Sequence, residues 1–278
     1  MTYGRLEIYW SNKMLMAMLI GGSEKSEGIL IKCPRGNRIK AKILIIGFPG
    51  IGHVGKIAVD YLIEALKAKP ICDVYFGGFP PEVEVGPDGI VDLAKGTFYY
   101  WSSNKRRGRG ILIFTAPHQP QSPESSFNLG RFIIDFAKSK GVKQVYTLAA
   151  YASMQYVTRP RIYAATTDVE TSKMLAKYGV IIMSDGTIRG LNGTIIGLAR
   201  LENLRGACIM GETTGIIGLD FNAAKAALDT LLKILDIDVN TKPLEERGRL
   251  FMETLKARER EIKAAEEKER KEPPSYIG

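Results

Sequence analysis

Short apolar runs alternate along most of this chain with segments that carry apolar residues at helical spacing. The clearest run is Lys42–Ile46 (KILII), and Val54–Lys67 after it has the helical pattern. A short apolar run without polar alternation is typical of a strand buried on both faces. The alternation predicts an α/β domain of three layers, α/β/α, in which helices cover both faces of a mostly parallel sheet.

The same patterns predict the other elements of the body. Turn residues between Glu82–Val85 and Gly89–Leu93 indicate a hairpin. Ser122 indicates the start of one helix, and Thr167 or Asp168 indicates the start of another. The predicted strands and helices are, in chain order, Ile71–Phe76, Thr97–Trp101, Ile111–Thr115, helix Ser125–Lys138, Val142–Ala149, Ile162–Thr166, helix Val169–Tyr178, Ala207–Gly211 and helix Asn222–Leu235.

The C-terminal segment has a different pattern, which divides the chain at Thr241. Residues 1–240 are predicted to form the α/β domain, and residues 241–278 a charged helix and tail. Apolar residues of Leu244–Lys271 recur at spacings of four and three, a narrow seam of coiled-coil type. The seam and the tail supply the residues that we expect to bind a partner: Phe251, Leu255, Ile262, Tyr276 and Ile277. A charged surface helix is the alternative reading of this segment.

Positive charge is concentrated in the body of the chain. The net charge is +9, yet residues 244–272 hold nine basic and nine acidic side chains. The densest basic cluster, Lys105–Arg109, reads as a solvated hairpin tip or as a contact for a polyanion. No aromatic residues are interleaved with it as in single-strand binders, so nucleic acid is not the expected partner.

A glycine-rich turn follows the first predicted strand. Gly50, Gly52 and Gly55 form a G-x-G-x-x-G pattern between a strand and a helix, as in a dinucleotide site. However, Asp73 lies near the start of the second strand, where the ribose-binding acid is expected at the end, and no Lys-Ser/Thr pair follows. The turn therefore has two readings, a nucleotide site or a tight turn with close packing. We expect no ATP, NAD or FAD to bind here.

Catalytic and metal-binding patterns are sparse. His118 follows a strand, but no nucleophile elbow accompanies it. The two histidines cannot form a His-rich metal site, and Cys33, Cys72 and Cys208 indicate neither a disulfide framework nor a zinc site. No signal peptide and no spanning apolar run is evident. We therefore expect a cytoplasmic protein without cofactor, metal or catalysis. Its richness in Lys, Arg and Glu suits a thermophilic source.

Three segments together resemble the archaeal branch of the proteasome-assembly-chaperone family. They are Gly47–Ile63 (GFPGIGHVGKIAVDYLI), Gly193–Leu198 (GTIIGL) and Ala207–Leu228. The resemblance implies a fold of phosphorylase/hydrolase type without established catalysis. It also implies a cyclic homo-oligomer that binds proteasome subunits or other proteins.

The C-terminal end departs from the family pattern. Relatives that dock on proteasome α rings end in a hydrophobic residue, Tyr and any residue, whereas this chain ends in Ser275–Gly278 (SYIG). The expected function is an oligomeric assembly chaperone or adaptor that binds partners through its C-terminal helix and tail. The alternative is a nucleotide-dependent enzyme that uses the turn of residues 47–55.

Overall fold

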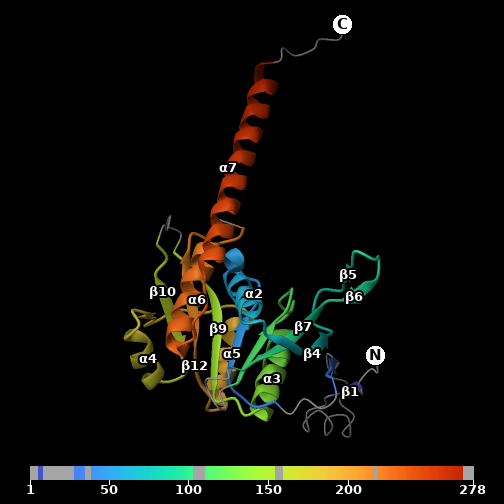
Figure 1. The fold of residues 1–278 in the computed structure, drawn as a ribbon, viewed down its shortest axis with the longest axis vertical. Helices are drawn as coiled ribbons and strands as arrows, with labels where there is room; N and C mark the ends of the chain where they lie inside the picture. Colours follow the sequence, from blue (N-terminus) through green and yellow to red (C-terminus); the bar gives the residue numbers. More distant parts are fainter. Residues whose placement is uncertain are drawn as a thin grey trace.

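A computed structural model describes residues 6–8, 28–34, 39–102, 110–153, 159–215 and 218–271. Within these ranges the chain forms one large sheet in the order β1-β2-β4-β7-β8-β3-β9-β12-β10-β11 and a separate hairpin, β5–β6 (Figure 1). The strands are β1 Leu6–Ile8, β2 Ile29–Lys32, β3 Ala41–Gly47, β4 Lys69–Phe76, β5 Val83–Val85, β6 Val91–Leu93, β7 Lys95–Trp101, β8 Gly110–Thr115, β9 Gln144–Ala152, β10 Ile162–Thr166, β11 Ile181–Ile182 and β12 Arg205–Thr213.

The sheet is mixed, so the prediction of a mostly parallel sheet was wrong. Only the pairings β3–β8, β3–β9, β9–β12 and β10–β11 are parallel. The other five pairings in the large sheet are antiparallel. The hairpin β5–β6, without a helix, connects β4 to β7, and a connection of this kind permits antiparallel pairing. A parallel centre is therefore flanked by antiparallel strands on both sides.

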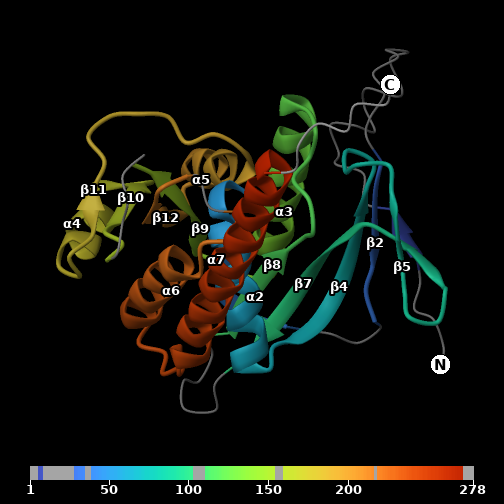
Figure 2. The same cartoon turned by 90° about the horizontal axis from the view of Figure 1, so that it is seen from above.

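Helices cover both faces of the sheet. The helical elements are η1 Ile51–His53, α2 Val54–Leu66, α3 Pro123–Ser139, α4 Val169–Ala176, α5 Leu191–Leu201, α6 Phe221–Leu235 and α7 Lys242–Lys271. One hydrophobic core lies under α3 and α5, and another lies under α2 and α6 (Figure 2). Along β3, Leu44 and Ile46 enter the first core while Ile43 and Ile45 enter the second. This confirms that the apolar run of β3 is a strand buried on both faces.

Local signals placed the predicted helices well. Ser122 caps α3 by accepting a hydrogen bond from the backbone N–H of Ser125, and Pro123 occupies the first turn. Asp168 caps α4 through the backbone N–H of Thr171. In contrast, α5 was not predicted as an element, because its sequence LNGTIIGLARL begins without a polar capping side chain and contains two glycines.

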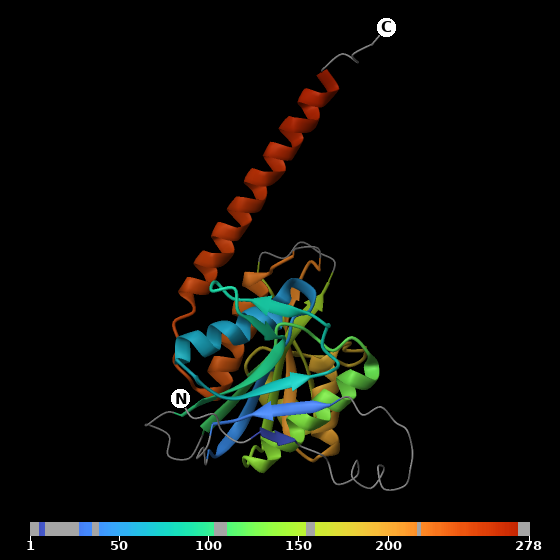
Figure 3. The same cartoon turned by 90° about the vertical axis from the view of Figure 1, so that its right-hand side faces the viewer.

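Two features project from the body. Figures 1 and 3 show α7 extending away from the sheet and its covering helices. The hairpin β5–β6 lies outside the large sheet, beyond β4 and β7 (Figure 2). Among the described residues, no helix combines the length and apolar character needed to cross a membrane.

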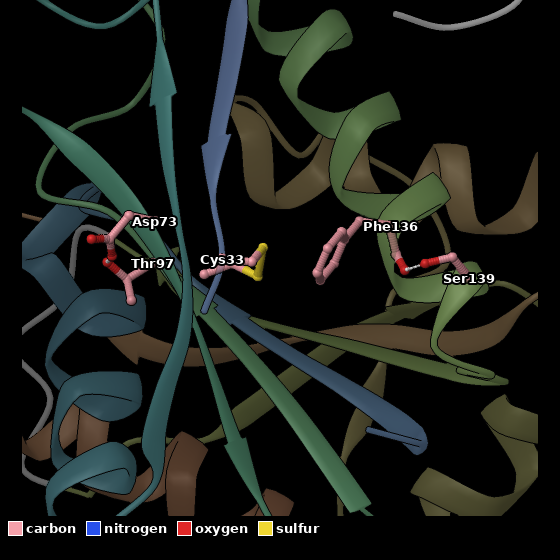
Figure 4. Close-up of a disulfide and its surroundings, with 6 residues drawn as sticks. Cys33, Asp73, Thr97, Phe136 and Ser139 are labelled. Carbon is pink, nitrogen blue, oxygen red and sulfur yellow. Dashed lines mark hydrogen bonds between the residues drawn. A yellow bond between two sulfur atoms is a disulfide. The ribbon is translucent and has the colours of Figure 1, made fainter. Parts of the chain in front are cut away.

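A disulfide joins Cys33 to Cys72, contrary to the expectation of unpaired cysteines (Figure 4). The antiparallel pairing of β2 with β4 aligns Lys32 with Asp73, so Cys33, which follows Lys32, lies opposite Cys72, which precedes Asp73. The bond therefore fastens the short strand β2 to β4. Nearby, Asp73 accepts a hydrogen bond from Thr97 of β7 at 3.0 Å, and the Ser139 hydroxyl donates to the Phe136 carbonyl on α3 (Figure 4).

Candidate functional site

The glycine-rich turn places α2 in very close contact with the sheet. A Cβ on Gly55 would lie 2.1 Å from the backbone oxygen of Leu148, and a Cβ on Gly47 would lie 2.1 Å from the oxygen of Gly55. No real Cβ occupies such a position, so both residues must be glycine for α2 to pack on β9. This geometry supports the close-packing reading of the turn.

The middle of the turn is fitted against the start of α6. Gly52 has a φ of 59°, and a Cβ there would lie 3.0 Å from the Cβ of Asp220. Asp220 caps α6 through the N–H of Ala223, accepts a hydrogen bond from Thr213, and donates its own N–H to the Gly52 carbonyl at 2.8 Å. The turn is therefore held from the α6 side by a hydrogen-bond network centred on Asp220.

The base of α7 belongs to the packed body. Leu244 is completely buried in the core under α2 and α6. The ring of Phe251 contacts that of Phe221 with centroids 5.7 Å apart. Arg247 forms an ion pair with Glu64 of α2 at 2.9 Å and lies over the Tyr61 ring. The first turns of α7 thus stabilise the body, although the predicted domain boundary lies before them.

Beyond its base, α7 presents charged side chains to solvent. Residues 256–258, 260 and 261 are exposed, and Leu255 is half-buried. Of the predicted partner-binding residues, Phe251 is engaged by α6. The side chain of Ile262, together with Tyr276 and Ile277, lies outside the described part of the chain, as does the basic cluster Lys105–Arg109. The proposed role of these residues in partner binding remains a prediction.

The hairpin β5–β6 has one apolar face that sequence patterns did not single out. Val83 pairs with Leu93 and Val85 with Val91, so all four side chains share a face, while Glu84 and Asp92 share the other. Val85 is 67% exposed and its three apolar neighbours are at least 49% exposed. Together with exposed Ile90, these four residues form an apolar patch of the kind that marks interaction surfaces.

A pocket of about 290 Å³ lies at the carboxyl ends of β3, β9 and β12. Gln119, in the loop after β8, joins two of its walls: its side-chain nitrogen donates to the Pro49 carbonyl, and its oxygen accepts from the backbone N–H of Leu191. Arg189 and Asn192 also line it. Sequence reasoning missed these three residues; only the position of Gln119 just after a parallel strand could have indicated it.

An ion pair between buried Glu212 and exposed Arg161 fixes the end of β12. Both oxygens of Glu212 accept hydrogen bonds from the Arg161 guanidinium, at 2.8 and 2.6 Å, and the Arg161 backbone N–H also donates to it at 3.2 Å. These hydrogen bonds lower the pKa of Glu212 to about 2 against the opposing effect of burial. The pair holds the start of β10 to β12, which makes its role structural.

Comparison with known proteins gives consistent matches over most of the chain. An uncharacterized protein of Methanocaldococcus jannaschii, MJ1210, is 33% identical over 246 residues, which are 85% of this chain and 92% of that protein. The crystal structure of Pyrococcus furiosus PbaB, an archaeal proteasome activator, has a TM-score of 0.77 at 30% identity and covers 84% of this chain and 100% of PbaB.

A second solved structure shares the fold. Pyrococcus furiosus PbaA, an archaeal homologue of proteasome-assembly chaperone, has a TM-score of 0.68 at 24% identity, with 86% of this chain and 99% of PbaA covered. The model of the PAC2 family matches residues 44–258, from β3 to the exposed part of α7. With its glycine turn, its three-layer body and these relatives, the chain belongs to the PAC2 family.

Proposed function

We propose that this protein is a non-catalytic, oligomeric assembly chaperone or adaptor that binds protein partners, proteasome subunits among them, through the exposed part of α7 and the tail. The observation that carries the proposal is the contrast within α7. Its base is anchored by Leu244 and Phe251, whereas its distal half projects from the body (Figure 3), and residues 256–258, 260 and 261 there are exposed.

An anchored base gives the projecting helix a defined direction. An isolated helix of this length is marginal in water, so packing of the base on α6 helps to maintain the helix in the turns beyond it. A helix of 30 residues extends about 45 Å, at about 1.5 Å per residue. Such an arm can reach a partner without the body touching it. The similarity to PbaB, a proteasome activator, supports proteasome subunits as the partner class.

The apolar hairpin supports the oligomeric part of the proposal. A two-stranded hairpin with one exposed apolar face gains stability when another surface covers that face. A second copy of this chain is the occupant that we propose, because a ring of identical subunits presents several arms at once. A closed cyclic assembly would bury every such hairpin equally.

The experiment is a binding assay with purified archaeal proteasome core particles and two truncated forms. One form ends at Thr254 and retains the buried base of the helix; the other ends at Glu272 and lacks only the tail. We expect both to keep the melting temperature of the full chain. Binding to the core particle should be lost in the shorter form. The affinity of the longer form measures how much Tyr276 and Ile277 contribute to that binding.

Cutting after Thr254 and not at Pro243 is essential, because a cut at Pro243 would remove buried Leu244 and unfold part of the body. Undiminished binding by the form that ends at Thr254 would show that the arm is not the binding surface. A charge-matched control is the full chain with Arg249→Gln at the anchored base, which should bind as the unmodified protein does.

A further inference from the structure

The pocket beside the glycine turn has features that the adaptor role does not use. It opens at the carboxyl ends of neighbouring parallel strands, β3, β9 and β12, where ligands bind in open α/β sheets. Its floor is apolar, with Phe48, Met183 and Met210, and its rim carries polar groups. None of the described residues that line it is acidic, whereas exposed Arg189 supplies a positive charge.

Two helices begin at this pocket, and neither is capped by the side chain of its own N-cap residue. The N-terminal residue before α2 is His53 and that before α5 is Gly190; neither makes a capping hydrogen bond, and neither helix has an acidic residue in its first turn. In α3, α4 and α6, by contrast, a Ser or Asp side chain caps the N-terminus. Because neither first turn holds an acidic residue, the positive ends of α2 and α5 favour an anion beside them.

Asn192 gives an independent indication of a ligand. It lies in the first turn of α5, is 6% exposed, and lines the pocket, yet its side-chain oxygen has no hydrogen-bond partner among the described residues. Its backbone N–H also has no acceptor there, whereas that of Leu191 donates to the Gln119 side chain and those of Gly193 and Thr194 donate to the Gly190 carbonyl. An unpaired buried carbonyl is costly unless a bound group donates to it.

We infer that this pocket binds a small phosphate-bearing compound. Its oxyanion is held by Arg189 and by the backbone N–H of Asn192, beside the positive ends of α2 and α5, and an O–H of the ligand donates to the Asn192 side-chain oxygen. A volume of about 290 Å³ is at the lower end of the range for ligand pockets, so the site suits a compound smaller than a dinucleotide. Free phosphate and a small phosphate ester share this chemistry.

The central test compares inorganic phosphate with sulfate, using calorimetry on the full-length protein near pH 7 at constant ionic strength. The two anions are alike in shape, but only phosphate carries an O–H that can donate to Asn192. We expect phosphate to bind at least about tenfold more tightly than sulfate, as one hydrogen bond to a charged group predicts. Tighter binding of ribose 5-phosphate would identify a phosphate ester as the ligand; equal binding would identify free phosphate.

Three variants separate the contributions of Arg189 and Asn192 to anion binding. Arg189→Ala should weaken the binding of both anions at least about tenfold, because the charge-assisted contact is lost. Arg200→Ala, at the opposite end of the same helix, is the matched control and should bind as the wild type does. Asn192→Leu should remove the preference for phosphate over sulfate. Its fold is expected to hold, because the Asn192 backbone oxygen that accepts from Thr147 is unchanged.

The inference fails if phosphate and sulfate bind equally or not at all at millimolar concentration. It also fails if Arg189→Ala has the same affinity as Arg200→Ala. Because Arg189 is exposed at the rim, the comparison between the two arginine variants stands even if Asn192→Leu does not fold. Loss of proteasome binding in the truncated forms is independent of these outcomes, so the two proposals can fail separately.

Discussion

Gly55 lies so close to Leu148 of β9 that a Cβ on residue 55 would approach the Leu148 backbone oxygen to 2.1 Å. The obstruction is backbone, not a flexible side chain, so a side-chain rotation cannot relieve it. Gly47 faces Gly55 at the same separation on the β3 side. The resemblance of this turn to a dinucleotide fingerprint thus has a packing cause: two glycines allow α2 to rest directly on the sheet.

Replacement of Gly55 by alanine should destabilise the body severely. The added methyl group must displace α2 from β9, and overpacking of this kind costs about 3 kcal/mol or more when backbone cannot move. Urea unfolding of Gly55→Ala should show a clearly lower midpoint or no folded baseline. The matched control is Gly197→Ala in α5, where nothing lies within 4 Å of the new Cβ. That variant should be unchanged or more stable by up to about 1 kcal/mol; equal behaviour of the two would contradict the packing argument.

The Glu212–Arg161 pair should make stability depend on acid pH. The folded pKa of Glu212, about 2, is below its ordinary value of 4.5. Its contribution is therefore fully present above pH 4.5 and is lost as the pH falls from 4.5 toward 2. Glu212→Gln should lower stability at pH 7 by about 1–3 kcal/mol and flatten this part of the pH profile. Glu253→Gln, which breaks the exposed pair with Arg249, should change stability by less than about 1 kcal/mol. An unaltered acid profile in Glu212→Gln would refute the assignment.

Thiol labelling should distinguish the three cysteines. Cys33 and Cys72 are bonded to each other, and burial raises the pKa of the Cys208 thiol to about 11. Because the thiolate is the reactive form, iodoacetamide should label no cysteine in the native protein. After denaturation without reductant, mass spectrometry should find one label, on Cys208; after reduction it should find three. Labelling of Cys33 in the unreduced, denatured protein would show that the disulfide does not form.

The apolar hairpin face should determine the oligomeric state. Light scattering should give the wild type a mass that is a multiple of 30.7 kDa at micromolar concentration. Val85→Glu places a charge in the proposed interface and should reduce the mass to that of one chain. Its circular dichroism spectrum should be that of the wild type, because Val85 is 67% exposed within a single copy and the fold of one chain does not depend on it. Glu84→Gln, on the opposite face of the same strand, is the control and should assemble normally. An unchanged mass in Val85→Glu would exclude this face as the interface.

Much of the fold follows from local signals in the sequence. The apolar run of β3 required burial on both faces, the Ser122 and Asp168 caps gave helix starts, and the turn at Gly86–Gly89 gave a hairpin. Each signal involves neighbours in the chain, whose geometry is decided by backbone sterics and capping hydrogen bonds. The apolar seam of α7 is a local signal as well, although its first members, Leu244 and Phe251, pack on the body.

Other features depend on residues far apart in the chain and were decided only by the tertiary structure. The sequence could not order the strands, so it missed that β4 and β7 run antiparallel beside a parallel centre. It could not pair Cys33 with Cys72, since the β2–β4 register brings them together across a separation of 39 residues. The helix α5, weak in intrinsic propensity, forms because Leu191, Ile195 and Leu198 are buried against the sheet. The pocket joins residues of the Gly50 turn, the loop at Gln119 and the start of α5, and only packing could place these segments together.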